Sequence, residues 1–159
     1  YQEYAKEGPA SRTPRMFGFQ AAGAAPIVNG APVDHPDTIA SAIRIGNPAS
    51  WDLAVAAREA SAGVIEAVTD EEILAAHRVL SAEEGVFVEP ASAAGVAGLL
   101  KLAREGRLES GLRIAVTVTG HGLKDPDWAV KAAPPLPEAV PAQVEAVARG
   151  RRLTSVTFP

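Results

Sequence analysis

Four short motifs could bind a ligand, because each follows an apolar run. They are Gln20–Gly23, Ile45–Pro48, Glu89–Ser92 and Thr119–Gly122, and three of the four combine a polar side chain with glycine or other small neighbours. In open α/β sheets, ligands bind outside the carboxyl ends of the strands. Small residues let the backbone approach a ligand there, and one or two polar side chains orient it. The four motifs therefore predict a ligand-binding edge.

Each motif also has a purely structural interpretation. Gly46-Asn47-Pro48 is a typical turn sequence. Glu89 before Pro90 is compatible with a solvated strand end or with the dipole of a following helix. Ser92 suits a helix cap, and Thr119 suits a strand because it is β-branched. Taken one at a time, these residues leave both interpretations open.

The histidines give little support for a metal or a general base. His35 lies in a proline-rich loop with Asp34 and Asp37, but the spacing matches no strong metal motif. His77 falls on an apolar helix face and is predicted to be packed, whereas His121 lies in a glycine-rich turn where it can line a pocket. No metal site is predicted. The phosphate-loop, serine-hydrolase, zinc-protease and dinucleotide motifs are absent from the sequence.

The elements that would position these motifs alternate between strand and helix. Helices are predicted to begin at Ser50, at Thr69 with Glu72 completing a capping box, at Ala91 and at Asp125. Strands are predicted over 15–20, 64–68, 86–88 and 112–118, the last being the strongest, with a further strand end over 43–48. Since the strands are apolar throughout, both faces of the sheet are expected to be covered. The predicted fold class is α/β, with a layered parallel sheet.

Composition restricts the possible classes of function. The 159 residues are 47% apolar, carry a net charge of −4 and include no cysteine. One hydrophobic core is expected, and a disulfide framework or thiolate nucleophile is excluded. The acidity argues against nucleic acid, and no apolar run approaches a membrane span, so a cytoplasmic location is predicted. The sequence opens without Met in what resembles the last turns of a helix, Tyr1–Gly8, so we expect a piece of a longer polypeptide.

Four segments in order carry a family resemblance: 14–26, 42–51, 87–94 and 118–126. Together they resemble the threonine synthases of the bacterial short-chain type, in register from about Tyr1 to Gly150. That family belongs to the fold type II enzymes, which resemble the tryptophan synthase β subunit and use pyridoxal 5'-phosphate. The resemblance implies conversion of O-phospho-L-homoserine and water to L-threonine and phosphate.

The resemblance also implies roles for particular residues. Thr119 resembles the hydroxyl that hydrogen-bonds the pyridine nitrogen of the cofactor. Gly120 and Gly122 would let the backbone turn tightly beside the ring, and Ala42–Gly46 resembles the segment that packs against a cofactor face. Glu89 resembles an acidic residue at the edge of the active site.

Two family motifs are missing from this sequence, namely the Schiff-base lysine and the loop that holds the cofactor phosphate. The lysines present, Lys6, Lys101, Lys124 and Lys131, do not match the family's lysine motif. No catalytic residue is therefore expected in this chain, and the chain alone is expected to be inactive. The resemblance divides it into part of the large cofactor-binding domain, 1–131, and a Pro/Ala linker with a terminal helix and tail, 132–159. The missing N-terminal part of the same enzyme is the implied partner, and the complete enzyme is expected to be a homodimer.

Two alternatives stay open. A threonine/serine dehydratase or cysteine synthase relative would share the fold, but the sequence Thr-Gly-His-Gly-Leu-Lys-Asp-Pro over 119–126 argues against it. A non-catalytic amino-acid-binding module could have kept the fold and lost the lysine. Against that alternative, Thr119 and its glycine-rich turn resemble a site adapted to a cofactor.

Overall fold

A computed structural model describes residues 1–132 and 142–143. The regular elements of this part of the chain, in order, are α1 (Gln2–Glu7), β1 (Phe17–Ala21), η1 (Ala22–Ala24), α2 (Pro26–Asn29), η2 (Ser41–Ile43), α3 (Trp51–Ala60), β2 (Val64–Val68), α4 (Asp70–Ala82), α5 (Pro90–Arg104), η3 (Gly122–Lys124) and α6 (Pro126–Ala132).

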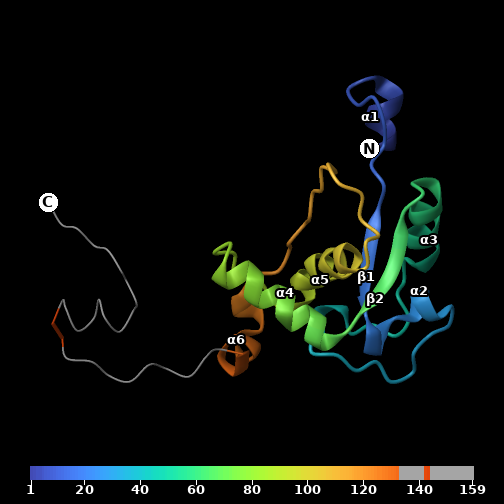
Figure 1. The fold of residues 1–159 in the computed structure, drawn as a ribbon. Helices are drawn as coiled ribbons and strands as arrows, with labels where there is room; N and C mark the ends of the chain where they lie inside the picture. Colours follow the sequence, from blue (N-terminus) through green and yellow to red (C-terminus); the bar gives the residue numbers. More distant parts are fainter. Residues whose placement is uncertain (133–141, 144–159) are drawn as a thin grey trace, which may run out of the picture.

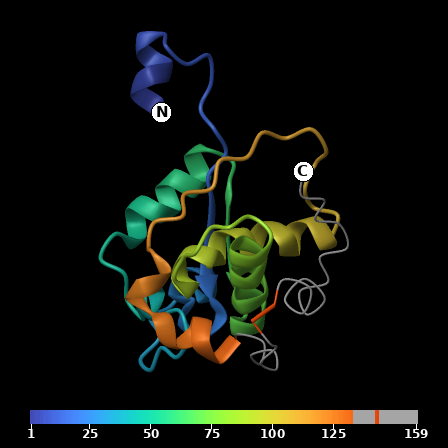
Figure 2. The same cartoon turned by 90° about the vertical axis from the view of Figure 1, so that its left-hand side faces the viewer.

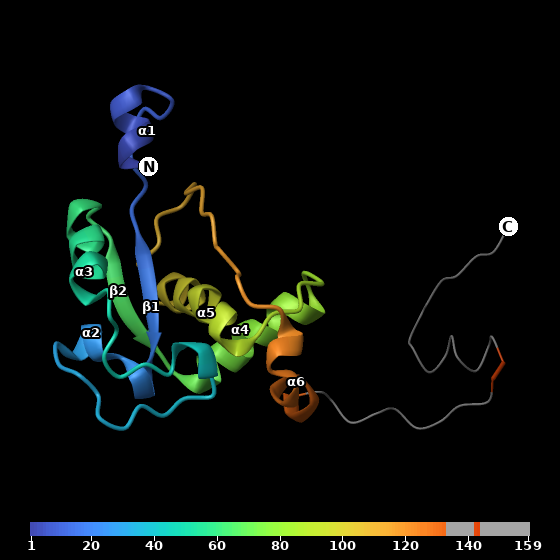
Figure 3. The ribbon, with the colours of Figure 1, turned by 180° about the vertical axis from the view of Figure 1, so that it is seen from behind.

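The centre of the fold is a parallel pair of strands. β1 pairs with β2 in a register that runs from Phe17 opposite Val64 to Ala21 opposite Val68. Helix α3 lies on one side of this pair, while α4 and α5 lie on the other (Figures 1 and 3). The parallel pairing and the helices on both sides confirm the predicted α/β fold class.

Small side chains let α5 approach the sheet closely. Its buried face includes Ala93, Ala94, Ala97 and Gly98. A Cβ added at Gly98 would lie 2.1 Å from a ring atom of Phe19 in β1, so only glycine fits at that point. The same face of α5 joins Val68, Ile73 and Ala76 in one buried cluster. The core therefore lies between the sheet and the α4–α5 pair.

Local sequence signals account for the ends of the helices. The predicted capping box begins α4, because the Thr69 side chain accepts from the Glu72 amide and the Glu72 carboxylate accepts from the Thr69 amide. Helix α3 begins after Ser50, as predicted, although the Ser50 side chain makes no capping hydrogen bond. Pro90 and Pro126 stand at the first positions of α5 and α6, where a proline loses no helical hydrogen bond.

Three of the predicted strands are wrong. Residues 112–118 form a loop that leads from the end of α5 back to α6, seen clearly in Figure 2. The alternate apolar residues of this loop, Leu112, Ile114, Val116 and Val118, are exposed. A strand needs a hydrogen-bonded neighbour, and the two-stranded sheet of the described residues offers this segment none.

The other two strand predictions fail for local reasons. Residues 86–88 contribute only an isolated antiparallel bridge between Val88 and His121. Over 43–48 the chain leaves the 3-10 turn η2, and Gly46 contacts a loop, because its carbonyl oxygen accepts from the Val33 amide at 2.9 Å. Contacts with irregular loops replace the predicted ladder in both segments.

Most of the predicted terminal helix over 142–150 and most of the predicted linker, 132–141, lie outside the described residues. Within the described residues, every helix is too short or too polar to cross a lipid bilayer.

Candidate functional site

The start of α5 holds Gly120 from both sides. The Ser92 side-chain oxygen accepts a hydrogen bond from the Gly120 amide at 2.7 Å, and the Glu89 amide donates to the Gly120 carbonyl oxygen at 3.0 Å. The bridge between Val88 and His121 extends this contact. Two of the predicted motifs, Glu89–Ser92 and Thr119–Gly122, therefore meet in space although they are distant in sequence.

Glu89 is a buried carboxylate with one cationic partner. The residue is 5% exposed, and its Oε1 lies 3.1 Å from the Nζ of Lys124. The Lys124 side chain is 61% exposed, so the pair has one end inside the protein and the other in solvent. A Cβ at Gly120 would lie 1.7 Å from Oε1 of Glu89. Glu89 is thus not a solvated strand end, and its side chain makes no capping bond to α5.

Gly122 is required by the packing of an aromatic ring. A Cβ at this position would lie 2.4 Å from the Phe87 ring, and the Gly122 amide donates to the Phe87 carbonyl oxygen at 3.2 Å. The Phe87 ring contacts the edges of two histidines, His77 at 6.2 Å and His121 at 5.7 Å between ring centroids. The two glycines of this turn are therefore explained by contacts inside the protein.

Thr119 and Ser92 differ in exposure and in use. Thr119 is exposed at the rim of the turn, directly before the buried Gly120. Ser92 is buried and does not cap α5, which corrects the simpler of its two interpretations, because its oxygen faces Gly120 instead. Thr119 is therefore exposed beside the turn, whereas the Ser92 side chain holds the backbone that follows it.

The residue before the predicted Ala42–Gly46 segment is joined to the residue that ends η3. Ser41 donates to the Asp125 carboxylate at 3.3 Å, which joins η2 to the end of η3. Ala42 is exposed, whereas Gly46 is half-buried, and a Cβ there would lie 1.9 Å from the Val33 carbonyl oxygen. The segment is therefore tied at its start to Asp125, three residues after the turn, and its glycine is required by the loop packed against it.

The remaining motif, Gln20–Gly23, has a structural role. The Gln20 side-chain oxygen accepts from the amides of Ile27 and Val28 at 3.0 and 3.2 Å, so it serves the start of α2. A Cβ at Gly23 would meet the Asp37 carbonyl oxygen at 1.8 Å.

Sequence reasoning missed the residue that anchors the Ala42–Gly46 segment. Asp70, predicted only as part of a helix start, accepts from the Thr38 hydroxyl at 2.5 Å and from the Ile39 amide at 3.1 Å. Arg44 in turn donates to the Thr38 carbonyl oxygen at 2.9 Å. Such a network between distant segments has no signature in local spacing, so no sequence signal could have revealed it.

The three histidines differ in burial and in hydrogen bonding. His77 is buried, as predicted, with its Nε2 2.8 Å from the Val88 carbonyl oxygen. His121 is exposed, and its Nδ1 accepts from the Leu123 amide at 3.2 Å. Among residues 1–132, the acidic and histidine side chains nowhere gather in a group of three suited to a metal ion, and this includes His35.

The chain matches a known family over most of its length. The family model described as "Pyridoxal-phosphate dependent enzyme" matches residues 1–120. Curated relatives named threonine synthase are 56% identical in Mycobacterium leprae, covering 93% of this chain, and 57% identical in Synechocystis, covering 81%. The chain spans about 40% of the Mycobacterium leprae protein and 33% of the Synechocystis protein.

Two solved structures share the fold. A fungal L-serine ammonia-lyase from Rhizomucor miehei matches 81% of this chain and 44% of its own, at 18% identity with a TM-score of 0.56. A threonine deaminase from T.th. matches 67% of this chain and 39% of its own, at 23% identity with a TM-score of 0.50.

Proposed function

The chain belongs to the family of pyridoxal-phosphate dependent enzymes, and from that premise we propose that it is part of a threonine synthase. The proposed reaction converts O-phospho-L-homoserine and water to L-threonine and phosphate. The observation that carries this proposal is 56% identity to a protein named threonine synthase, sustained over 93% of the chain. The two neighbouring structures bear on the fold alone, because their identities are 18% and 23%.

The residues of the site fit one end of the cofactor. Thr119 is an exposed residue with a neutral hydroxyl, and the backbone after it is held in place by α5. A neutral hydroxyl can donate a hydrogen bond to an unprotonated ring nitrogen, whereas a carboxylate would favour its protonated form. The carboxylate that contacts this turn from the start of α5, Glu89, is buried and paired with Lys124. The donor set therefore suits the nitrogen end of the ring.

The chain's own residues would bind and orient the cofactor. When bound, pyridoxal phosphate supplies an electron sink for bond changes at the β and γ carbons of an amino acid. Thr119 would hold the ring nitrogen, while Gly120 and Gly122 would keep the backbone turn beside it compact. Ala42–Gly46 would pack against a ring face, and Glu89 would line the edge of the site with Lys124 balancing its charge.

The remaining machinery is proposed to lie outside this chain. We assign neither the covalent lysine nor the phosphate loop to residues 1–159, so the preceding part of the same enzyme is the proposed partner. In this proposal, 1–131 is part of the large cofactor-binding domain and 132–159 is a linker with a terminal helix and tail. A homodimer and a cytoplasmic location of the complete enzyme stay predictions.

An exchange experiment tests the proposal. The matched segment of the Mycobacterium leprae threonine synthase is replaced by this chain, which gives what we call the exchanged enzyme. We expect a yellow, cofactor-binding protein that releases phosphate from O-phosphohomoserine at a rate within about tenfold of the parent, since 56% of the matched residues are identical. The isolated chain, supplied with pyridoxal phosphate, should release none. Phosphate is measured in a coupled assay beside the parent enzyme.

Other outcomes would identify the alternatives. A folded exchanged enzyme that releases ammonia from serine or threonine, without phosphate from O-phosphohomoserine, would favour a dehydratase. A folded protein that takes up no cofactor would favour a non-catalytic module. Phosphate release by the isolated chain would show that the covalent lysine lies within residues 1–159, contrary to the proposal.

A further inference from the structure

The exposed hydroxyl of Thr119 depends on the backbone that carries it. The segment before it, 112–118, forms no strand among the described residues and is exposed along its length. Among the described residues, no strand pairing holds Thr119 from the upstream side. Within the described part of the chain, the first hydrogen-bonded backbone group after this segment is the amide of Gly120.

The Gly120 amide belongs to the same rigid unit as the Thr119 carbonyl group. A peptide bond is planar, so a hydrogen bond to the Gly120 N–H also fixes the rotation about the Cα–C bond of Thr119. Ser92 accepts this bond at 2.7 Å from the N-terminal turn of α5, which is packed against the core. The Glu89 amide fixes the next peptide unit through the Gly120 carbonyl oxygen at 3.0 Å.

Only one of these two bonds comes from a side chain. The Glu89 contact is made by the main chain and survives any substitution except proline. The Ser92 contact depends on a single buried hydroxyl oxygen. We propose that Ser92 is a positioning residue, which holds the Gly120 amide and thereby directs the Thr119 hydroxyl toward the bound cofactor. This inference rests on the proposed function, because that function gives Thr119 its ligand.

The first test uses the exchanged enzyme with its cofactor. Ser92→Ala removes the acceptor and should lower kcat about 10- to 100-fold, because a displacement of about 1 Å at a reacting group has an effect of this size. KM should change little, since the bond orients the cofactor rather than the substrate. Ser92→Cys keeps a weak acceptor of similar size and should fall between the wild type and Ser92→Ala. A wild-type kcat in Ser92→Ala would overturn the proposal.

A double-mutant cycle separates positioning from general stabilisation. If Ser92 acts through Thr119, the double variant Ser92→Ala/Thr119→Ala should be no slower than Thr119→Ala alone. Additive losses would overturn the proposal. Ser81→Ala is the matched control. The Ser81 hydroxyl also bonds the backbone, because it donates to the His77 carbonyl oxygen at 2.6 Å. This bond lies within α4 and does not involve Gly120. The control should keep the wild-type kcat.

A measurement without cofactor or substrate makes the inference independent of the reaction. In the cofactor-free exchanged enzyme, Ser92→Ala should speed hydrogen exchange of the Gly120 amide about 10- to 100-fold by nuclear magnetic resonance. The Gly122 amide, which donates to Phe87, should be unaffected. Unchanged exchange at Gly120 would overturn the inference even if the wild type releases phosphate. Faster exchange in a protein that releases no phosphate would support the hydrogen bond between Ser92 and Gly120. It would refute only the proposed reaction.

Discussion

Glycine is required at several positions of this protein because another part of the chain already occupies the space that a Cβ atom would need. At Gly120 the occupying group is the Glu89 carboxylate, and at Gly122 it is the Phe87 ring. Sequence analysis attributed both glycines to a cofactor, and that role stays a proposal. Thr119, directly before Gly120, is exposed, and we propose it as the residue of this turn that meets the cofactor.

Substitution of Thr119 tests this assignment at a single atom. In the exchanged enzyme, Thr119→Ala should lower kcat about 10- to 100-fold, because a lost hydrogen bond to the ring costs about 1–3 kcal/mol. Thr119→Ser keeps the hydroxyl and should retain most of the activity. Steady-state kinetics and the absorbance spectrum of the bound cofactor measure both variants. Equal kinetics in Thr119→Ala and wild type would remove Thr119 from the site.

Helix α5 shows how an element positions a site through its small residues. One end of the helix holds Gly120, and its middle rests against β1, where Gly98 faces the Phe19 ring. On the same helix, Gly95 has ordinary space, since a Cβ there would lie 3.5 Å from a Val116 methyl group. Packing therefore excludes a side chain at Gly98 but leaves room for one at Gly95.

A matched pair of substitutions in α5 tests this difference. Gly98→Ala should lower the free energy of unfolding by about 1–3 kcal/mol, because the added methyl overlaps a packed aromatic ring. Gly95→Ala should raise it by about 0.5–1 kcal/mol, because alanine loses less backbone entropy in a helix. Urea denaturation of the exchanged enzyme measures both. A stabilising Gly98→Ala would show that α5 does not approach β1 this closely.

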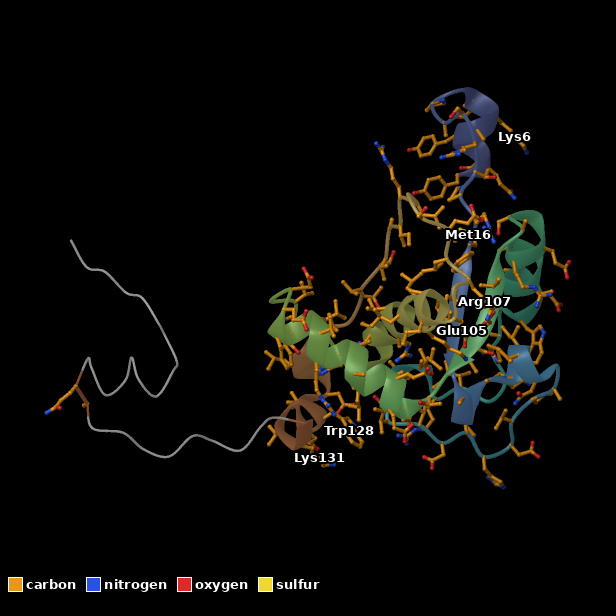
Figure 4. The ribbon with its side chains drawn as sticks, viewed as in Figure 1. Lys6, Met16, Glu105, Arg107, Trp128 and Lys131 are labelled. Atoms are coloured by element: carbon orange, nitrogen blue, oxygen red, sulfur yellow. The ribbon has the colours of Figure 1, made fainter. Side chains whose placement is uncertain are left out.

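At the scale of the whole molecule, charged residues connect the sheet to the far end of α5. Arg107, which follows α5, makes a paired hydrogen bond to the Glu66 carboxylate of β2 and a further one to Glu105 at 2.9 Å. Figure 4 shows Arg107 and Glu105 together beside the sheet. A cation–π contact between Lys131 and Trp128, at 4.6 Å, is confined to α6 and makes no such connection.

The Glu66–Arg107 pair predicts a loss of stability in acid. The hydrogen bond from Arg107 and the nearby positive charges lower the pKa of Glu66 below its ordinary 4.5. The same contacts raise the pKa of Arg107, which stays charged throughout. A group with a lowered folded-state pKa stabilises the protein above its unfolded-state pKa and loses that contribution as pH falls through the folded-state value.

Glu66→Gln should therefore lower the urea midpoint at pH 7, and its difference from wild type should shrink as the pH falls below about 4.5. Glu109→Gln is the matched control, because Glu109 and Arg15 lie 3.6 Å apart with both side chains largely exposed. Its midpoint should follow that of the wild type at every pH. A Glu66→Gln difference that grows in acid would contradict the assignment.

Local signals in the sequence predicted a large part of the described elements. The strands at 15–20 and 64–68 were predicted close to their observed bounds, as were the capping box at Thr69 and the helix starts at Ser50 and Pro126. These features depend on residues within a few positions of one another. Motif order along the chain also indicated a pyridoxal-phosphate dependent enzyme, and the family match over 1–120 confirms that part of the prediction.

Tertiary structure alone decided which motifs meet. Residues 112–118 have the composition of a strand, but β-structure requires a neighbouring strand, which no local pattern supplies. In the same way, the type of residue 92 could not reveal that its oxygen faces Gly120 rather than its own helix. The sequence by itself determined the longer helices, the capping box at Thr69 and the pyridoxal-phosphate family, because these depend on neighbours along the chain or on shared residues. The contacts around Gly120 join residues 28 or more positions apart, so only the folded chain could decide them.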